Sequence, residues 1–265
     1  MLIDAHAHVD RFEIVGEGAL DQALAEIKER NIFTISNSMD LPSYERNRQI
    51  AEDSDYILPI FGVHPWNASH YVDRLDELDG AIESSPMIGE VGLDFYFVED
   101  KTEYPNQRKV LEYFLAACKK QNKIAILHTK GAEELILKLL KEFELPRVII
   151  HWYSGPIDIF KKLVDMGICF TIGVESIYST HIQEIALSVP VDQMLTETDN
   201  PGGVKAFIGG PGTPKLIEEV VDKIAELRNS RRDEIISLVQ RNLLHLLRDD
   251  PRFGDTVLPL IKLGI

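Results

Sequence analysis

Short runs of hydrophobic residues alternate along this chain with longer segments in which hydrophobic residues recur every three or four positions. The short runs predict eight β-strands, over residues 2–5, 32–36, 56–62, 87–91, 124–127, 148–150, 168–172 and 194–196. Some of these runs are hydrophobic throughout, which is typical of parallel strands that are covered on both faces.

The longer segments predict amphipathic helices. Three hydrophobic stripes are clear: Leu111, Phe114, Leu115 and Cys118; Leu135, Leu139 and Leu140; and Ile217, Val220, Val221 and Ile224. Thr213 and Pro214 are suited to the N-cap and first position of the last of these helices. One more helix is expected at about residues 233–247.

Eight strands that each precede a helix, in a chain of 265 residues, predict an α/β fold of the (β/α)₈ TIM-barrel type. We expect one domain over residues 1–265, with an extra C-terminal helix. A doubly wound open sheet is the alternative, but no Gly-x-Gly-x-x-Gly motif follows an early strand. The Gly- and Pro-rich segment 201–213 after the last strand is either a phosphate-binding loop or a flexible surface loop.

The charge of the chain limits its partners. Its 43 acidic and 28 basic residues give a net charge of −15, which argues against a broad basic surface for duplex DNA or anionic lipid. A small cationic site stays possible, because bound metals invert the local field. Cys118 and Cys169 both lie in hydrophobic patterns and are expected to be buried thiols. No signal peptide or membrane span is visible, so we expect a cytoplasmic protein with no membrane association.

Six residues that commonly bind metals lie at the ends of predicted strands. They are His6 and His8 after the first strand, Glu90 at the end of the fourth, His128 and His151 after the fifth and sixth, and Asp199 after the eighth. The two-residue spacing of His6 and His8 places both rings on one side of a strand. In a barrel, the carboxyl ends of the strands meet at the face where active sites lie.

Four imidazoles and two carboxylates suit zinc, manganese or nickel better than calcium. They are too many for one catalytic ion with an open position. Two ions that share a bridging carboxylate fit better, and such pairs bind phosphoryl groups and activate water. The alternative is a set of rim residues that only hydrogen-bond to each other. Asp94 and Glu197 rank lower, as partners that orient the ligands.

Six ordered stretches carry a resemblance to a known family: DAHAH (4–8), GVHP (62–65), GEVGLD (89–94), ILHT (126–129), IHWYSG (150–155) and TETDNP (196–201). Asn242 also falls where that family has an Asn. On these motifs the chain resembles the TatD-type metal-dependent deoxyribonucleases of the amidohydrolase superfamily. The match keeps its order over nearly the whole length.

The resemblance implies a two-metal hydrolase that cleaves phosphodiester bonds, at DNA 3′ ends or in single strands. His6, His8 and Asp199 would hold one divalent ion (zinc, manganese, nickel or magnesium), and His128 and His151 the other. Glu90 would bridge the two ions, and Asp199 would also be the general base. The catalytic residues are thus expected to be Asp199 and Glu90.

His64 and Lys130 are the expected substrate-binding residues, and a structural His64 hydrogen-bonded at a turn is the equal alternative for the first. Trp66 either stacks on a base or packs under a loop. Two departures weaken the case for a DNA substrate: Lys130 stands where the family commonly has Arg, and segment 201–213 offers only Lys205 as a cation. The alternatives are a hydrolase of a small phosphodiester, ester, amide or aminoacyl-tRNA, and a non-catalytic barrel that binds a partner. A monomer without an obligate protein partner is expected.

Overall fold

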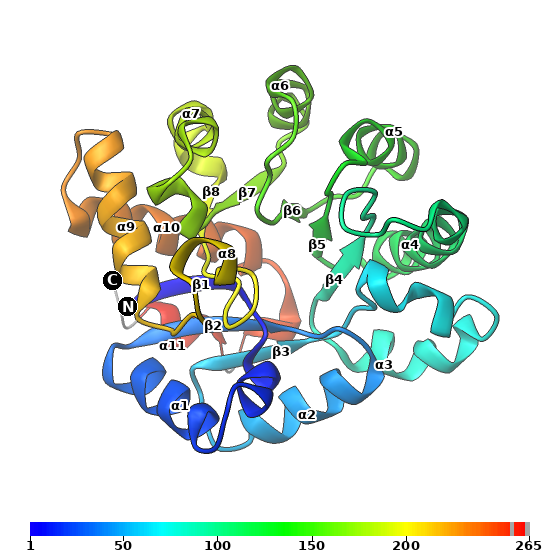
Figure 1. Cartoon of the computed structure of the whole chain (residues 1–265), viewed down its shortest axis with the longest axis horizontal. Coiled ribbons are helices and arrows are strands. Elements are labelled where there is room, and N and C mark those ends of the chain that lie inside the picture. The colour runs from blue at the N-terminus through cyan, green and yellow to red at the C-terminus, as the bar shows by residue number, and fades with distance from the viewer. Residues whose placement is uncertain (255–256, 263–265) are drawn as a thin grey trace. The chain divides into compact units, whose positions relative to one another are not determined.

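The computed structural model describes residues 1–254 and 257–262, and strands and helices alternate along this chain (Figure 1). The strands are β1 (Leu2–Ala7), β2 (Ile32–Asn37), β3 (Ile57–Ile60), β4 (Ile88–Gly92), β5 (Ala125–His128), β6 (Val148–Ile150), β7 (Cys169–Ile172) and β8 (Met194–Thr196). All eight predicted strands are present, and β3 is shorter than the predicted 56–62.

The helices are α1 (Ala19–Glu29), α2 (Leu41–Ala51), α3 (Asp79–Ser84), α4 (Tyr104–Gln121), α5 (Glu133–Phe143), α6 (Ile157–Asp165), α7 (Thr180–Ser188), α8 (Lys205–Ile208), α9 (Leu216–Leu227), α10 (Arg232–Leu247) and α11 (Val257–Lys262). None of the helices in the described part of the chain is long and apolar enough to cross a bilayer.

The internal contacts of the chain divide it into two compact units, which are described one at a time. Unit 1 comprises Met1–Ser36, Arg46–Pro59 and Phe170–Ile265, and unit 2 comprises Asn37–Glu45 and Ile60–Cys169. The prediction of one domain over residues 1–265 stays a prediction.

Unit 1 is built on parallel strand pairs. β1 pairs with β2, with Leu2 beside Ile32, and β7 pairs with β8, with Phe170 beside Met194. The hydroxyl of Thr196 donates a hydrogen bond to the carbonyl of Ile3, so β8 also lies against β1. α9 and α10 pack on these two strands. Every residue of β1 and β2 is buried, including the polar residues Asp4, His6, Thr34 and Asn37.

Asn242 of α10 anchors that helix to the start of β8. Its side-chain amide donates hydrogen bonds to the carbonyls of Val191 (2.6 Å) and Met194 (2.7 Å). This Asn is therefore a structural residue at the end of β8 opposite Asp199.

We expect Asn242→Ala to lower the free energy of unfolding by about 1–2 kcal/mol, because two carbonyls lose their donor. The denaturant midpoint measures this effect. Arg241→Ala, an exposed neighbour on the same helix, is the matched control and should change stability by less than about 0.5 kcal/mol. Equal effects of the two substitutions would contradict the anchoring role.

Unit 2 contains the parallel strands β4, β5 and β6, with Ile88 beside Ala125 and Ala125 beside Val148. Phe61 forms a bridge to Ile88. α4 packs on β4 and also contacts α5 (Figure 1). The predicted stripe of α4 faces the core, since its four members, Leu111, Phe114, Leu115 and Cys118, are at most 1% exposed. Cys169 is buried like Cys118, as expected for both thiols.

Three local predictions need correction. α9 begins at Leu216 rather than at Pro214, because the preceding residues form a turn in which the Leu216 N–H donates to the Thr213 carbonyl. Leu135 of the α5 stripe is only half-buried, and Ile136 is buried instead. Segment 201–213 is not simply a flexible loop: it contains α8, and Asn200 donates a 2.6 Å hydrogen bond to the Thr213 carbonyl.

Candidate metal centre

A first cluster in unit 1 consists of His6, His8 and Asp199. The Nε2 atoms of His6 and His8 lie 3.5 and 3.4 Å from Oδ1 of Asp199. His6 is fully buried and His8 is 9% exposed. The predicted effect of the two-residue spacing is thus present, because both rings face the same carboxylate oxygen.

Backbone pairing fixes the position of Asp199. Its N–H donates to the carbonyl of His6 (2.9 Å), and the N–H of His8 donates to the carbonyl of Asn200 (2.8 Å). Asp199 has a φ of 53°, in the left-handed region that Asp and Asn tolerate better than most residues. The two imidazoles and the carboxylate are therefore set against each other by the main chain as well as by their own contacts.

Asp4 supports the first cluster in a way that the sequence does not reveal. Its buried carboxylate accepts hydrogen bonds from the N–H (2.9 Å) and the hydroxyl (2.6 Å) of Thr198, the residue before Asp199. Burial raises the pKa of Asp4 to about 7 in spite of these hydrogen bonds, which act to lower it. Asp4 thus links the segment before His6 to the segment before Asp199.

A second cluster in unit 2 consists of Glu90, His128 and His151. Glu90 lies in the middle of β4 rather than at its predicted end, His128 ends β5, and His151 directly follows β6. Oε1 of Glu90 lies 2.7 Å from Nδ1 of His128 and 2.8 Å from Nε2 of His151. The two imidazole nitrogens are 3.2 Å apart. All three side chains are buried. The structure therefore brings these three predicted ligands together at one point.

Asp94 determines which nitrogen of His128 faces that point. Nε2 of His128 lies 3.1 Å from Oδ2 of Asp94 and Nδ1 lies 2.7 Å from Oε1 of Glu90, so both ring nitrogens face a carboxylate oxygen. With Nε2–H donating to Asp94, Nδ1 is the nitrogen that would bind a metal. Burial lowers the pKa of His128, but the hydrogen bonds to Asp94 and Glu90 outweigh burial and raise it. Asp94 contacts a predicted ligand, as expected of an orienting residue.

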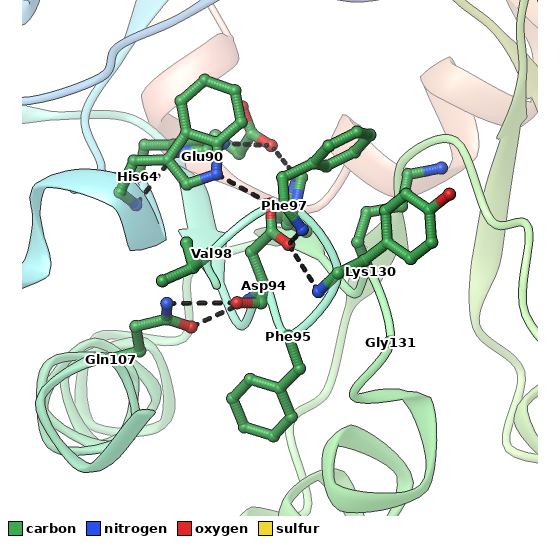
Figure 2. Close-up of polar contacts among 12 residues, drawn as sticks. His64, Glu90, Asp94, Phe95, Phe97, Val98, Gln107, Lys130 and Gly131 are labelled. Carbon is green, nitrogen blue, oxygen red and sulfur yellow. Dashed lines mark hydrogen bonds and ion pairs between the residues drawn. The ribbon is translucent and has the colours of Figure 1, made fainter. Parts of the chain in front are cut away.

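The Asp94 carboxylate is itself held in its charged form. Burial acts to raise its pKa, but the hydrogen bond and charge of His128, together with the N–H groups of Phe97 and the Trp66 ring, lower it to about 2. Figure 2 shows Asp94 at the centre of this network, with Gln107 on one side and Phe97 on the other.

We expect Asp94→Asn to weaken metal binding by the second cluster by roughly 10–100-fold, because an amide cannot accept hydrogen bonds from His128 and Trp66 through its nitrogen. Metal titration against a competing chelator measures this change. Asn can still accept from the N–H groups of Tyr96 and Phe97, so the turn should persist. Unchanged affinity would show that Asp94 does not orient His128.

His64 accepts a hydrogen bond from the turn that it begins. Its Nδ1 accepts from the backbone N–H of Trp66 (3.2 Å), so the proton of the neutral ring is on Nε2. Nε2 lies 3.5 Å from Oε1 of Glu90, and His64, Glu90 and His128 form one of the buried groups that could hold a metal ion. The hydrogen bond to Trp66 is the one expected of a structural His at a turn, and contact of His64 with substrate stays a prediction.

Lys130 and Glu197 occupy defined positions within their own units. Nζ of Lys130 donates to the Trp152 carbonyl (3.2 Å) and the Ser154 hydroxyl (2.7 Å), and lies 5.1 Å from the centre of the Trp152 ring. Its contact with substrate stays a prediction. Glu197 is fully buried against Gly173 in unit 1.

Both clusters fit a divalent metal. Ligand atoms at about 2.0–2.2 Å from one ion are about 3 Å from each other. The nitrogen–oxygen separations of 2.7–3.5 Å in the two clusters match that spacing. Imidazole nitrogens with carboxylate oxygens are also the donors that zinc, manganese and nickel accept.

Three glycines enclose the backbone around Glu90. A Cβ atom at Gly62 would lie 2.5 Å from the Glu90 carbonyl oxygen, and one at Gly92 would lie 2.0 Å from the His128 carbonyl oxygen. A Cβ atom at Gly89 would lie 2.8 Å from Oδ1 of Asn37. The close approach of these segments therefore requires glycine at all three positions.

Comparisons with known proteins identify the family of the chain. A family model described as TatD related DNase matches residues 3–248. The metal-dependent hydrolase YabD of Bacillus subtilis (strain 168), described as uncharacterized, is 29% identical over 259 residues, which cover 94% of this chain and 99% of the relative. The human deoxyribonuclease TATDN3 is 26% identical over 262 residues, which cover 92% of this chain and 94% of the relative.

A solved structure is also similar. The crystal structure of YjjV, a TatD homologue from Escherichia coli K12, matches with a TM-score of 0.84 at 24% identity, covering 93% of this chain and 98% of that chain. This likeness confirms the predicted α/β fold of the TIM-barrel type. Since the family model also spans nearly the whole chain, the protein belongs to the TatD-related DNase family.

Proposed function

We propose that this metal-dependent hydrolase of the TatD family cleaves phosphodiester bonds of DNA, at 3′ ends or in single strands, with two divalent ions per chain. The observation that carries the proposal is that the imidazoles gather around two different carboxylates, Asp199 and Glu90. One such cluster would be enough for a single ion. The description of human TATDN3 as a deoxyribonuclease supports the choice of substrate.

The two clusters would hold one ion each. His6, His8 and Asp199 are the proposed ligands of the first ion, and Glu90, His128 and His151 those of the second. The bridging role of Glu90 rests on the family resemblance. When bound, the ions would polarise the phosphoryl oxygens and lower the pKa of the attacking water.

The side chains of the site would move the proton and hold the substrate. Asp199 would accept the proton of the attacking water while the water oxygen forms its bond to phosphorus and the bond to the leaving oxygen breaks. His64 would donate a hydrogen bond from Nε2 to a phosphate oxygen. The Lys130 ammonium group would offset phosphate charge as a point charge.

The net charge of −15 favours a second candidate, a hydrolase of a small ester, an amide or an aminoacyl-tRNA. Proteins that grip a long DNA backbone usually carry clustered basic residues. The same two clusters would serve this reaction, since fold does not fix the substrate.

Cleavage of 3′-labelled single-stranded DNA by the metal-loaded protein tests the first proposal. We expect cleavage that a chelator abolishes and that metal restores. A chain that elemental analysis shows to carry metal, but that leaves the DNA intact, would overturn the nuclease proposal. Hydrolysis of small esters, amides or aminoacyl-tRNA by the same preparation would then support the second candidate.

A further inference from the structure

Three large aromatic side chains near the second cluster are exposed. Trp66 is 55% exposed, Tyr96 72% and Phe97 58%. Their rings are adjacent, with centres 6.3 Å apart for Trp66 and Phe97 and 4.8 Å apart for Tyr96 and Phe97. We call these three residues the aromatic platform. Exposed aromatic side chains that cluster, unlike single exposed ones, commonly mark a binding surface.

The platform is joined to the second cluster by a series of ring contacts. The centre of the His64 ring lies 4.8 Å from that of His128 and 4.7 Å from that of Trp66, both edge to face. Trp66 in turn contacts Phe97. A ligand on the exposed rings would therefore lie next to any group that the second cluster holds.

The backbone under Tyr96 and Phe97 is firmly held. Oδ1 of Asp94 accepts hydrogen bonds from the N–H groups of Tyr96 (3.0 Å) and Phe97 (2.7 Å). Gln107 of α4 accepts from the Asp94 N–H and donates to the Asp94 carbonyl (Figure 2). The Tyr104 hydroxyl lies 3.1 Å from the carbonyl oxygens of Phe95 and Val98, the residues that flank Tyr96 and Phe97. Rings presented on such a backbone lose little conformational entropy when they bind a ligand.

Trp66 is held by its polar edge. Its ring N–H donates a 2.7 Å hydrogen bond to Oδ2 of Asp94, the oxygen that also faces His128. The polar group of the indole is thus satisfied within the protein, and the exposed part of the side chain is hydrocarbon. This arrangement suits stacking against a flat partner rather than a polar contact.

We propose that the aromatic platform binds an unpaired nucleobase of single-stranded nucleic acid, next to the phosphate that the second cluster would hold. The proposal rests on the function proposed above and names its substrate class. A net charge of −15 weakens the general attraction between the chain and a phosphate backbone. Stacking of bases on aromatic side chains is the other main source of affinity for single strands, and a paired base does not offer its faces.

Intrinsic fluorescence gives a test that does not depend on cleavage. The chain has two tryptophans, and Trp152 is only 9% exposed. In a Trp152→Phe background, Trp66 is the sole tryptophan. We expect a short phosphorothioate-linked oligothymidylate to quench its fluorescence in metal-loaded protein. An abasic oligonucleotide of equal length and charge should leave the fluorescence unchanged.

Variants of the platform locate the contact. Phe97→Ala and Tyr96→Ala should each raise the Kd for the oligothymidylate by roughly tenfold, because each removes a stacking surface. Tyr178→Ala, which removes an aromatic ring of similar exposure (52%) from unit 1, is the matched control and should have no effect on Kd.

Three results would overturn the platform proposal: equal quenching by the abasic oligonucleotide, wild-type affinity in Phe97→Ala, or sedimentation showing a dimer that Phe97→Ala dissociates. Failure of the nuclease proposal has a different signature. Quenching by the phosphorothioate oligonucleotide, with no cleavage of unmodified single-stranded DNA, would keep the platform and remove the nuclease function. Cleavage of that DNA with an equal KM in wild type and Phe97→Ala would keep the nuclease function and remove the platform.

Discussion

Asp199→Asn should lower turnover of single-stranded DNA by roughly 10²–10⁴-fold, the usual range for loss of a general base. An amide oxygen can still contact a metal, but an amide does not accept the proton of water. His6 and His8 remain, so we expect at least one ion to stay bound. Rate measurements and elemental analysis of the same preparation report the two effects separately.

The backbone conformation at position 199 should be the same in Asp199→Asn as in the wild type. Its φ of 53° suits Asn as well as Asp, so the segment around Asn200 should keep its place. Asp199→Ala would add strain at this position and serves as the comparison. Near-normal turnover by Asp199→Asn would show that Asp199 is not the general base. Loss of all metal from this variant would show that Asp199 acts as a metal ligand, with no separate evidence for a role as base.

Glu90→Ala should reduce the number of metal ions per chain. Oε1 of Glu90 lies within 3.5 Å of nitrogens of His64, His128 and His151, so its removal takes the only carboxylate from the second cluster. If Glu90 also bridges the ions, as the resemblance implies, both sites weaken. Elemental analysis after gel filtration counts the ions.

Glu90→Gln separates loss of charge from loss of volume. The amide fills the same buried space, so a lower metal count in this variant cannot be assigned to a cavity. Circular dichroism of both variants checks that the fold persists. An unchanged count in Glu90→Ala would show that Glu90 is neither a bridge nor an important ligand.

The strands could be predicted from the sequence because they are buried on both faces. β6, for example, has the predicted bounds of 148–150, since no polar residue interrupts its hydrophobic run. Helix starts were less predictable. Thr213 and Pro214 have the composition of a helix start, yet they belong to a turn in which the Leu216 N–H donates to the Thr213 carbonyl, and α9 begins only at Leu216.

The ligand residues could be predicted because their types are few and each lies in a strand or shortly after one, although His6 and Glu90 lie within β1 and β4 rather than after them. The proton positions could not. The tautomer of His64 depends on the Trp66 N–H and that of His128 on Asp94, and both contacts depend on the folded loops. The role of Asp4 was also hidden, because its partner Thr198 is 194 residues away in sequence.

The aromatic platform lies largely beyond the reach of sequence patterns. Tyr96 and Phe97 follow the GEVGLD motif and look like ordinary core residues by type. Only the turn capped by Asp94 turns them outward. The sequence is compatible with Trp66 stacking on a base or packing under a loop, and its exposure of 55% favours stacking.

The glycines around Glu90 limit how this enzyme can acquire new activities. Any side chain at Gly62, Gly89 or Gly92 would collide with a main-chain or side-chain atom beside the second cluster. Random libraries at these positions should yield almost only inactive clones. Tyr96 and Phe97, in contrast, tolerate change because they are exposed. Selection for a new substrate should therefore accumulate mutations in the turn after Asp94 while the strand ends stay constant.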